Sequence, residues 1–85
     1  MSRVLLRPPA QRFLRKLRDT SLTARLVAAM RGLAGQPRPP GCDKLVGLED
    51  LYRIRVGDYR IVYQVRDEVL LVLVVKIGHR REVYR

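Results

Sequence analysis

A tight break between two strand-like segments constrains the fold of this chain more than any other feature. Residues 51–56 and 59–66 are rich in β-branched and aromatic side chains, and only Gly57 and Asp58 separate them. A Gly-Asp pair between two such segments is typical of a two-residue hairpin turn. The sequence therefore predicts an antiparallel β-hairpin over residues 51–66.

The chain before this hairpin predicts one short strand and two helices. Residues 3–7 form the strand, and Pro8-Pro9 favour a helix start because proline suits the first helical turn. Residues 19–21 (Asp-Thr-Ser) supply N-cap chemistry for a second helix, which ends at Gly35. The expected buried stripes are Phe13, Leu14 and Leu17 in the first helix and Leu22, Leu26, Ala29, Met30 and Leu33 in the second.

The remaining segments complete an α+β order. Residues 35–47 hold three prolines and three glycines and predict a loop. After a short Asp67-Glu68 turn, residues 69–77 predict a last strand whose seven consecutive apolar residues, 69–75, indicate a central strand covered on both faces. We expect one domain, residues 1–85, with β-α-α-β-β-β order and a two-helix hairpin on one face of a mainly antiparallel, twisted sheet.

The charge of the chain indicates a polyanionic partner. Eighteen Lys and Arg stand against eight Asp and Glu, a net charge of +10, and fifteen of the cations are arginines, which bind phosphate bidentately. Residues 1–38 hold nine cations and one acid, whereas residues 39–85 hold nine cations and seven acids. We expect nucleic acid, an acidic protein, or both as partners. The alternative is a basic surface that only keeps the protein in solution.

Several classes of function find no support in the residues. Cys42 is a lone cysteine without metal-ligand neighbours, which fits a reducing cytosol. No segment has the length of a signal peptide or of a membrane span. Gly-rich phosphate loops, paired carboxylates and a serine beside a base are also missing. We expect a cytoplasmic protein with no membrane partner, metal ligand or cofactor.

One face of the predicted hairpin gathers arginines. With Gly57 and Asp58 as the turn, Arg55 lies opposite Arg60, and Arg53 shares their face because side chains alternate along a strand. Directly opposed like charges destabilise a sheet by roughly 0.2–1 kcal/mol, and a bound anion would reverse that effect. The cluster therefore indicates an anion site, the alternative being an ordinary polar face in water.

The chain after the last strand adds basic and aromatic groups. His79, the only histidine, is a candidate for proton transfer, and Tyr84 is a candidate base-stacking platform. The alternatives are a surface histidine and a tyrosine packed at the chain end. RNA cleavage without a metal can use the substrate's own 2′-hydroxyl as nucleophile, while the protein aligns it, moves protons and stabilises the phosphate. DNA lacks this hydroxyl, so the constellation indicates RNA.

Four runs in the second half of the chain match a known pattern: Lys44–Gly47, Leu51–Val56, Asp58–Val65 and Gly78–Tyr84. With the order of elements, they resemble the RelE/ParE toxin superfamily, on its RelE side. The resemblance implies the toxin of a type II toxin–antitoxin system, an endoribonuclease that cleaves mRNA in the ribosomal A site. It also implies three partners: mRNA, the ribosome with its 16S rRNA, and an acidic antitoxin encoded alongside.

The resemblance also implies roles for single residues. Arg60 resembles the arginine that stabilises charge on the scissile phosphate, and Arg80 resembles the residue proposed to protonate the leaving 5′-oxygen. Tyr84 resembles the tyrosine that orients the substrate. Arg53 and Arg55 stand where RelE-like toxins often carry lysines, one of them proposed as general base. Further candidates for phosphate binding are Arg81 and Lys44.

The two arginines at these lysine positions leave the proton acceptor open. A guanidinium stays protonated, so Arg53 and Arg55 are expected to hold phosphate. The candidate acceptors are His79, Asp43 and Glu49.

Two other functions fit the same fold, because fold alone does not decide function. One is ParE-like inhibition of DNA gyrase without nuclease activity, and the other is a non-catalytic nucleic-acid-binding module. Arg60, Arg80 and Tyr84 together favour the ribonuclease, since a gyrase inhibitor needs no phosphate-centred set.

Overall fold

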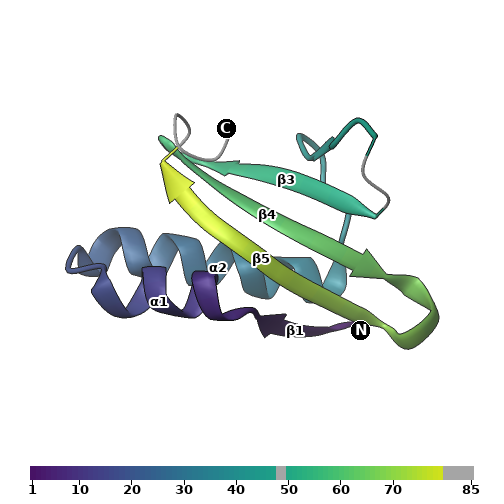
Figure 1. Ribbon diagram of the computed structural model, residues 1–85, viewed down its shortest axis with the longest axis horizontal. Coiled ribbons are helices and arrows are strands. Elements are labelled where there is room, and N and C mark those ends of the chain that lie inside the picture. Colours follow the sequence, from purple (N-terminus) through teal and green to yellow (C-terminus); the bar gives the residue numbers. More distant parts are fainter. Residues whose placement is uncertain (48–49, 80–85) are drawn as a thin grey trace.

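The computed structural model describes residues 1–47 and 50–79. Within these residues, a five-stranded sheet has the order β1-β5-β4-β3-β2, and both helices lie against one of its faces (Figure 1). The predicted α+β class and two-helix layer are confirmed. In chain order the elements are β1 (Arg3–Leu6), α1 (Pro8–Lys16), α2 (Thr20–Gly35), β2 (Asp43–Lys44), β3 (Leu51–Val56), β4 (Tyr59–Arg66), the 3₁₀ turn η1 (Asp67–Val69) and β5 (Leu71–His79).

Both helices begin where the sequence predicts. Pro8 and Pro9 occupy the first turn of α1, where the N–H that proline lacks would have no helical acceptor. The Asp19 carboxylate caps α2, because its Oδ1 accepts a 3.0 Å hydrogen bond from the Leu22 N–H. The predicted stripe of α2 faces the sheet: Leu26, Met30 and Leu33 are buried, and Leu22 and Ala29 are half-buried.

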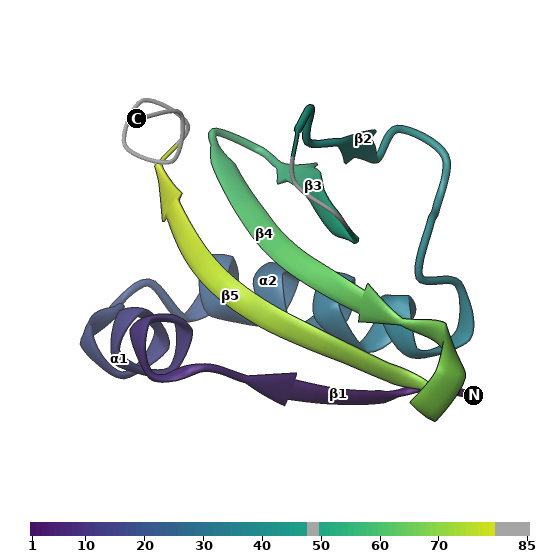
Figure 2. The same cartoon turned by 45° about the vertical axis from the view of Figure 1, so that its right-hand side comes forward.

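The central hairpin forms in the predicted register. Arg55 lies opposite Arg60, and Val56 lies opposite Tyr59. Gly57 in the turn has a φ of 60°, a conformation that glycine adopts without strain. At the other side of the sheet β1 pairs with β5 in parallel, so the first and last described strands lie side by side (Figure 2).

The predicted loop over residues 35–47 contains an element that the sequence did not predict. Asp43 and Lys44 form β2, which pairs with Arg53 and Tyr52 of β3. The prolines and glycines correctly mark a loop. A bridge of two residues is too short for periodicity to reveal.

The last strand also differs from its predicted bounds. It begins at Leu71 instead of residue 69 and continues to His79. The turn before it is the 3₁₀ turn η1 followed by Leu70 at a φ of 50°. A two-residue turn needs residues that tolerate positive φ at its centre, which an Asp-Glu pair does not supply.

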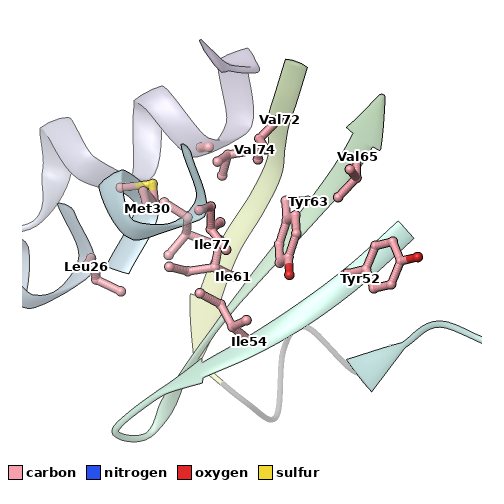
Figure 3. Close-up of a cluster of buried hydrophobic side chains, with 12 residues drawn as sticks. Leu26, Met30, Tyr52, Ile54, Ile61, Tyr63, Val65, Val72, Val74 and Ile77 are labelled. Carbon is pink, nitrogen blue, oxygen red and sulfur yellow. The ribbon is translucent and has the colours of Figure 1, made fainter. Parts of the chain in front are cut away.

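The core lies between the helices and one face of the sheet. Ile61 and Tyr63 are both 0% exposed and lie near its centre (Figure 3). The Tyr63 hydroxyl donates a 2.7 Å hydrogen bond to the Pro37 carbonyl, which ties the loop after α2 to the sheet, and burial raises the pKa of Tyr63. Other buried members are Ala10, Leu26, Met30, Leu33, Tyr52, Ile54, Val65, Val72, Val74 and Ile77.

The opposite face of the sheet carries no helix among the described residues (Figures 1 and 2). β5 is central in the sheet, as predicted, but its two faces differ. Val72 and Val74 face the helices and are 0% exposed, whereas Leu71 and Leu73 are half-buried on the other side. Within the described residues, the helices cover one face of β5, whereas the sequence predicted that both of its faces would be covered. No helix of the described residues has the length and apolar character to cross a membrane.

Candidate functional site

Four basic side chains occupy neighbouring positions on the sheet face away from the helices. Arg55 of β3 and Arg60 of β4 form one row across the strands, which continues to Gly78 of β5. Arg53 of β3 and Lys76 of β5 lie in the next row, on either side of Val62. We call Arg53, Arg55, Arg60 and Lys76 the arginine face.

A β-bulge decides that Lys76 belongs to this face. Val62 lies opposite Lys76, but its neighbour Tyr63 lies opposite Val74, so Val75 is the extra residue of β5. One extra residue inverts the alternation of the strand after it. Lys76 consequently faces outward and is exposed, while Ile77 turns into the core. Lys76 was not among the residues predicted from the sequence, because no local pattern marks the bulge.

Arg60 is the most enclosed charged residue that the structure describes. It is 7% exposed, although it projects from the face opposite the helices, and its Nη1 donates a 3.4 Å hydrogen bond to the Tyr59 carbonyl. Arginine side chains keep their charge at physiological pH. Removing such a charge from water is unfavourable unless acceptors or anions surround it. Arg60 thus presents a cation with restricted freedom beside the exposed Arg55.

Arg53 and Arg55 are each held by an oxygen near the edge of the sheet. Arg53 Nη2 lies 3.3 Å from Asp43 Oδ2 in an ion pair, and the Arg53 side chain is 19% exposed. Arg55 Nε donates a 3.2 Å hydrogen bond to the Gly57 carbonyl in the hairpin turn. These contacts orient both side chains.

His79 lies on the helix side of the sheet, away from the arginine face. It is opposite Tyr59, and the two rings pack edge to face with their centroids 5.6 Å apart. The Tyr59 ring in turn packs against the Phe13 ring of α1, with the two centroids 5.9 Å apart. Gly78 occupies the outward position opposite Arg60, so alternation turns His79 to the helix side. The structure thus places His79 apart from Arg53, Arg55 and Arg60, and its role in proton transfer remains a prediction from the sequence.

Lys44 also lies away from the arginine face. Its partner across the strands is Tyr52, a core residue, so the exposed Lys44 side chain projects from the helix side of β2. The other predicted site residues, Glu49, Arg80, Arg81 and Tyr84, lie outside the described residues. The structure therefore brings together Arg53, Arg55 and Arg60 of the predicted set.

A second arginine interaction lies at the other end of the sheet and was not predicted. Arg38 binds both carboxylate oxygens of Asp67, at 3.2 and 2.8 Å, and its Nε donates to the Tyr52 hydroxyl at 2.9 Å. The Arg38 guanidinium holds the pKa of Asp67 below its usual range. Because Arg38 is already paired, we assign it to the attachment of the loop and not to a ligand site. The described residues contain no group of three His, Cys, Asp or Glu side chains arranged to hold a metal ion.

Comparison with solved structures defines the class of this protein as a RelE-type toxin. The intact RelBE toxin–antitoxin complex of E. coli contains a chain that matches with a TM-score of 0.81 and 30% identity, over 93% of this chain and 96% of that one. The archaeal RelE–RelB complex from Pyrococcus horikoshii matches with a TM-score of 0.81 and 28% identity, over 93% and 94% of the two chains. The resemblance inferred from the sequence is thereby confirmed.

Sequence comparison gives the family. The family model described as the ParE toxin of the type II toxin–antitoxin system, parDE, matches residues 4–84, and the chain belongs to this toxin family. Toxin RelG of Mycobacterium tuberculosis is 32% identical over 76 residues, which cover 89% of this chain and 87% of the relative. The mRNA interferase toxin RelE of E. coli K12 is 46% identical over 46 residues, 49% of this chain and 48% of that protein.

Proposed function

We propose that this toxin is an endoribonuclease that cleaves mRNA in the ribosomal A site without a metal ion. The observation that best supports the proposal is the direct opposition of Arg55 and Arg60 on the open face of the sheet, with Arg53 and Lys76 in the next row. Like charges so placed repel each other, whereas a phosphodiester between them would be attracted to both. The name of a relative, mRNA interferase, agrees with this chemistry.

The proposed reaction uses the RNA 2′-hydroxyl as nucleophile. Its oxygen attacks the adjacent phosphorus, the bond to the 5′-oxygen breaks, and the products are a 2′,3′-cyclic phosphate and a 5′-hydroxyl. The enclosed Arg60 would stabilise the extra negative charge of the transition state, since a fixed cation needs little reorganisation. Arg53 and Arg55 would hold the neighbouring phosphates. Arg80 and Tyr84 keep their proposed roles as proton donor and substrate-orienting group, and Arg81 that of a phosphate ligand.

The proposed partners follow from charge and from the relatives. Solved relatives are complexes of RelE with RelB, so we propose a cognate antitoxin for this chain, with an acidic segment that covers the arginine face. A ribosomal partner fits a second basic surface, because Arg12, Arg15 and Lys16 are exposed on α1, where they could meet 16S rRNA phosphates. Action on ribosomes would place the toxin in the cytoplasm.

Inhibition of DNA gyrase is the second candidate, because the matching family model is described as a ParE toxin. It makes a different prediction in cells. A gyrase inhibitor would stop replication and leave transcripts intact, whereas the proposed ribonuclease would cut them.

Primer extension on a defined mRNA, with and without ribosomes, tests the proposal. We expect cuts at codon positions that depend on the toxin and increase when ribosomes are present. Arg60→Ala should abolish both the cuts and growth arrest, while Arg66→Ala, an exposed arginine six residues along β4, should keep both. Because Arg60 is enclosed, circular dichroism must show that its variant is folded, and Arg60→Lys provides a milder second variant. Full toxicity of a folded Arg60→Ala protein would refute the assigned mechanism.

A further inference from the structure

We propose that Lys76 is an RNA-binding residue of this toxin, whose ammonium holds a phosphate next to the scissile one on the β5 side of the arginine face. The inference rests on the proposed ribonuclease function and deepens it, because that function assigns phosphate contacts to arginines and none to Lys76. The position of Lys76 in the sheet, and not a motif in the sequence, supports this role.

The bulge at Val75 turns Lys76 to the arginine face. Val72 and Val74 point into the core, so regular alternation would point residue 76 into it as well. The extra residue reverses the order, and as a result Lys76 is exposed while Ile77 is 4% exposed on the helix side. Bulges interrupt the hydrogen bonds of a strand pair, and they are frequent beside active sites, where they redirect a side chain. This bulge brings a charged side chain to the face that already carries three arginines.

Lys76 is a close neighbour of Arg60 across the β4–β5 pair. Arg60 lies opposite Gly78, and Lys76 precedes Gly78 by two residues on the same face. Diagonal neighbours of this kind are roughly 7–8 Å apart, within reach of long side chains. Arg53 lies farther away, since it flanks Val62 on the other side and two strand spacings amount to about 10 Å. Lys76 and Arg60 can therefore contact adjacent phosphates of one RNA strand.

The Lys76 ammonium has no counter-charge in the part of the chain that the structure describes. Ion pairs there join Arg38 to Asp67 and Arg53 to Asp43, and no described hydrogen bond or ion pair engages Lys76. An ammonium has three N–H donors and no acceptor. Because the side chain is exposed, these donors can bind an incoming phosphate without breaking a contact within the described protein.

The alternative is a lysine that only adds charge to the surface, and Arg66 provides the control for it. Arg66 is exposed and projects from the same face as Val62, four residues before it in sequence separation along β4. At about 3.3 Å per residue, the row of Arg66 is about 13 Å from the row of Lys76. Arg66→Gln thus removes the same charge from the same face, at a distance from the proposed contact.

Uncharged phosphate analogues in the RNA test the contact directly. Ribosomes are programmed with mRNAs in which one phosphate flanking the cut is replaced, position by position, by a methylphosphonate. Single-turnover cleavage with toxin in excess gives the saturated rate and the toxin concentration at half-saturation for wild type, Lys76→Gln, Lys76→Arg and Arg66→Gln. Circular dichroism and urea unfolding check the fold of each variant. Glutamine and arginine both keep a polar group at position 76, so neither favours the register without the bulge.

We expect Lys76→Gln to raise the half-saturating concentration by about fivefold on unmodified mRNA, with the saturated rate little changed. Lys76→Arg, which keeps the charge, should restore most of the affinity. At one flanking position the methylphosphonate should weaken the wild type by a similar factor and weaken Lys76→Gln no further, because the two changes remove the same interaction.

Two results would overturn the role of Lys76. One is that the effects of Lys76→Gln and of the methylphosphonate multiply at every flanking position. The other is that Arg66→Gln loses as much affinity as Lys76→Gln. Cleavage of unmodified mRNA by the wild type is measured first, and its absence would instead refute the proposed function, and with it the inference.

Discussion

Arg55 and Arg60 lie directly opposite each other in the hairpin, so their like charges should repel in the free protein. Arg55→Gln removes one of the two charges. Glutamine keeps an N–H donor that can replace the 3.2 Å hydrogen bond from Arg55 Nε to the Gly57 carbonyl. Arg55 is exposed, so the loss of repulsion should dominate the effect on stability. We therefore expect the variant to be more stable than the wild type.

The size of the expected gain in stability follows from the register of the hairpin. Directly opposed like charges in an antiparallel pair destabilise it by about 0.2–1 kcal/mol, and Arg55 and Arg60 are such a pair. With a urea m-value of about 1 kcal/mol/M for a domain of this size, the unfolding midpoint should rise by about 0.2–1 M. The gain should shrink in about 1 M salt, where screening extends over only about 3 Å.

Arg66→Gln is the matched control for this measurement. It removes the same charge from an exposed position on β4, but its partner across the strands is the uncharged Leu71. Both variants relieve the general repulsion of a chain with a net charge of +10, so their difference isolates the opposed pair. Urea titrations of the three proteins at low and high salt provide the comparison. An Arg55→Gln midpoint no higher than that of Arg66→Gln at low salt would refute the repulsion argument.

The same substitution should weaken function while it strengthens the fold. An interaction between a charged donor and phosphate is worth about 1.5–3 kcal/mol, so Arg55→Gln should reduce mRNA cleavage by about tenfold or more. Primer extension with equal amounts of folded wild-type and variant toxin measures this loss. A stabilised variant with full cleavage would show that the repulsion exists without serving RNA.

Two further predictions concern residues outside the arginine face. His79→Ala should lower the free energy of unfolding by about 0.5–1.5 kcal/mol through the lost contact with Tyr59. The single-turnover cleavage rate should stay unchanged. A tenfold slower rate in a folded variant would support a catalytic role for His79. Arg38 lowers the pKa of Asp67 in the folded state, so this pair stabilises the protein above the unfolded-state pKa of about 3.9 and loses its effect as the pH falls through the folded value. Asp67→Asn should therefore make the unfolding midpoint less sensitive to acid below about pH 4; an unchanged acid dependence would contradict the assignment.

Local signals were sufficient to predict the helices and the central hairpin. Proline and aspartate mark the helix starts by chemistry that acts within one turn, and both starts are confirmed by the structure. The turn at Gly57 sets the register of the hairpin, and the period of two then assigns Arg53, Arg55 and Arg60 to one face. Each of these predictions depends on neighbours no more than a few residues apart in the chain.

The tertiary structure alone decided the part of the site that depends on segments distant in the sequence. The bulge at Val75, the two-residue strand β2 and the parallel pairing of β1 with β5 all form between strands whose contacts no local pattern specifies. One extra residue reverses every later side chain, so His79 joins the core side and Lys76 the arginine face. The pairing of β2 likewise places Asp43 beside Arg53, although ten positions separate them in sequence. The sequence thus determined which charges share the hairpin, and long-range strand pairing determined which other groups reach them.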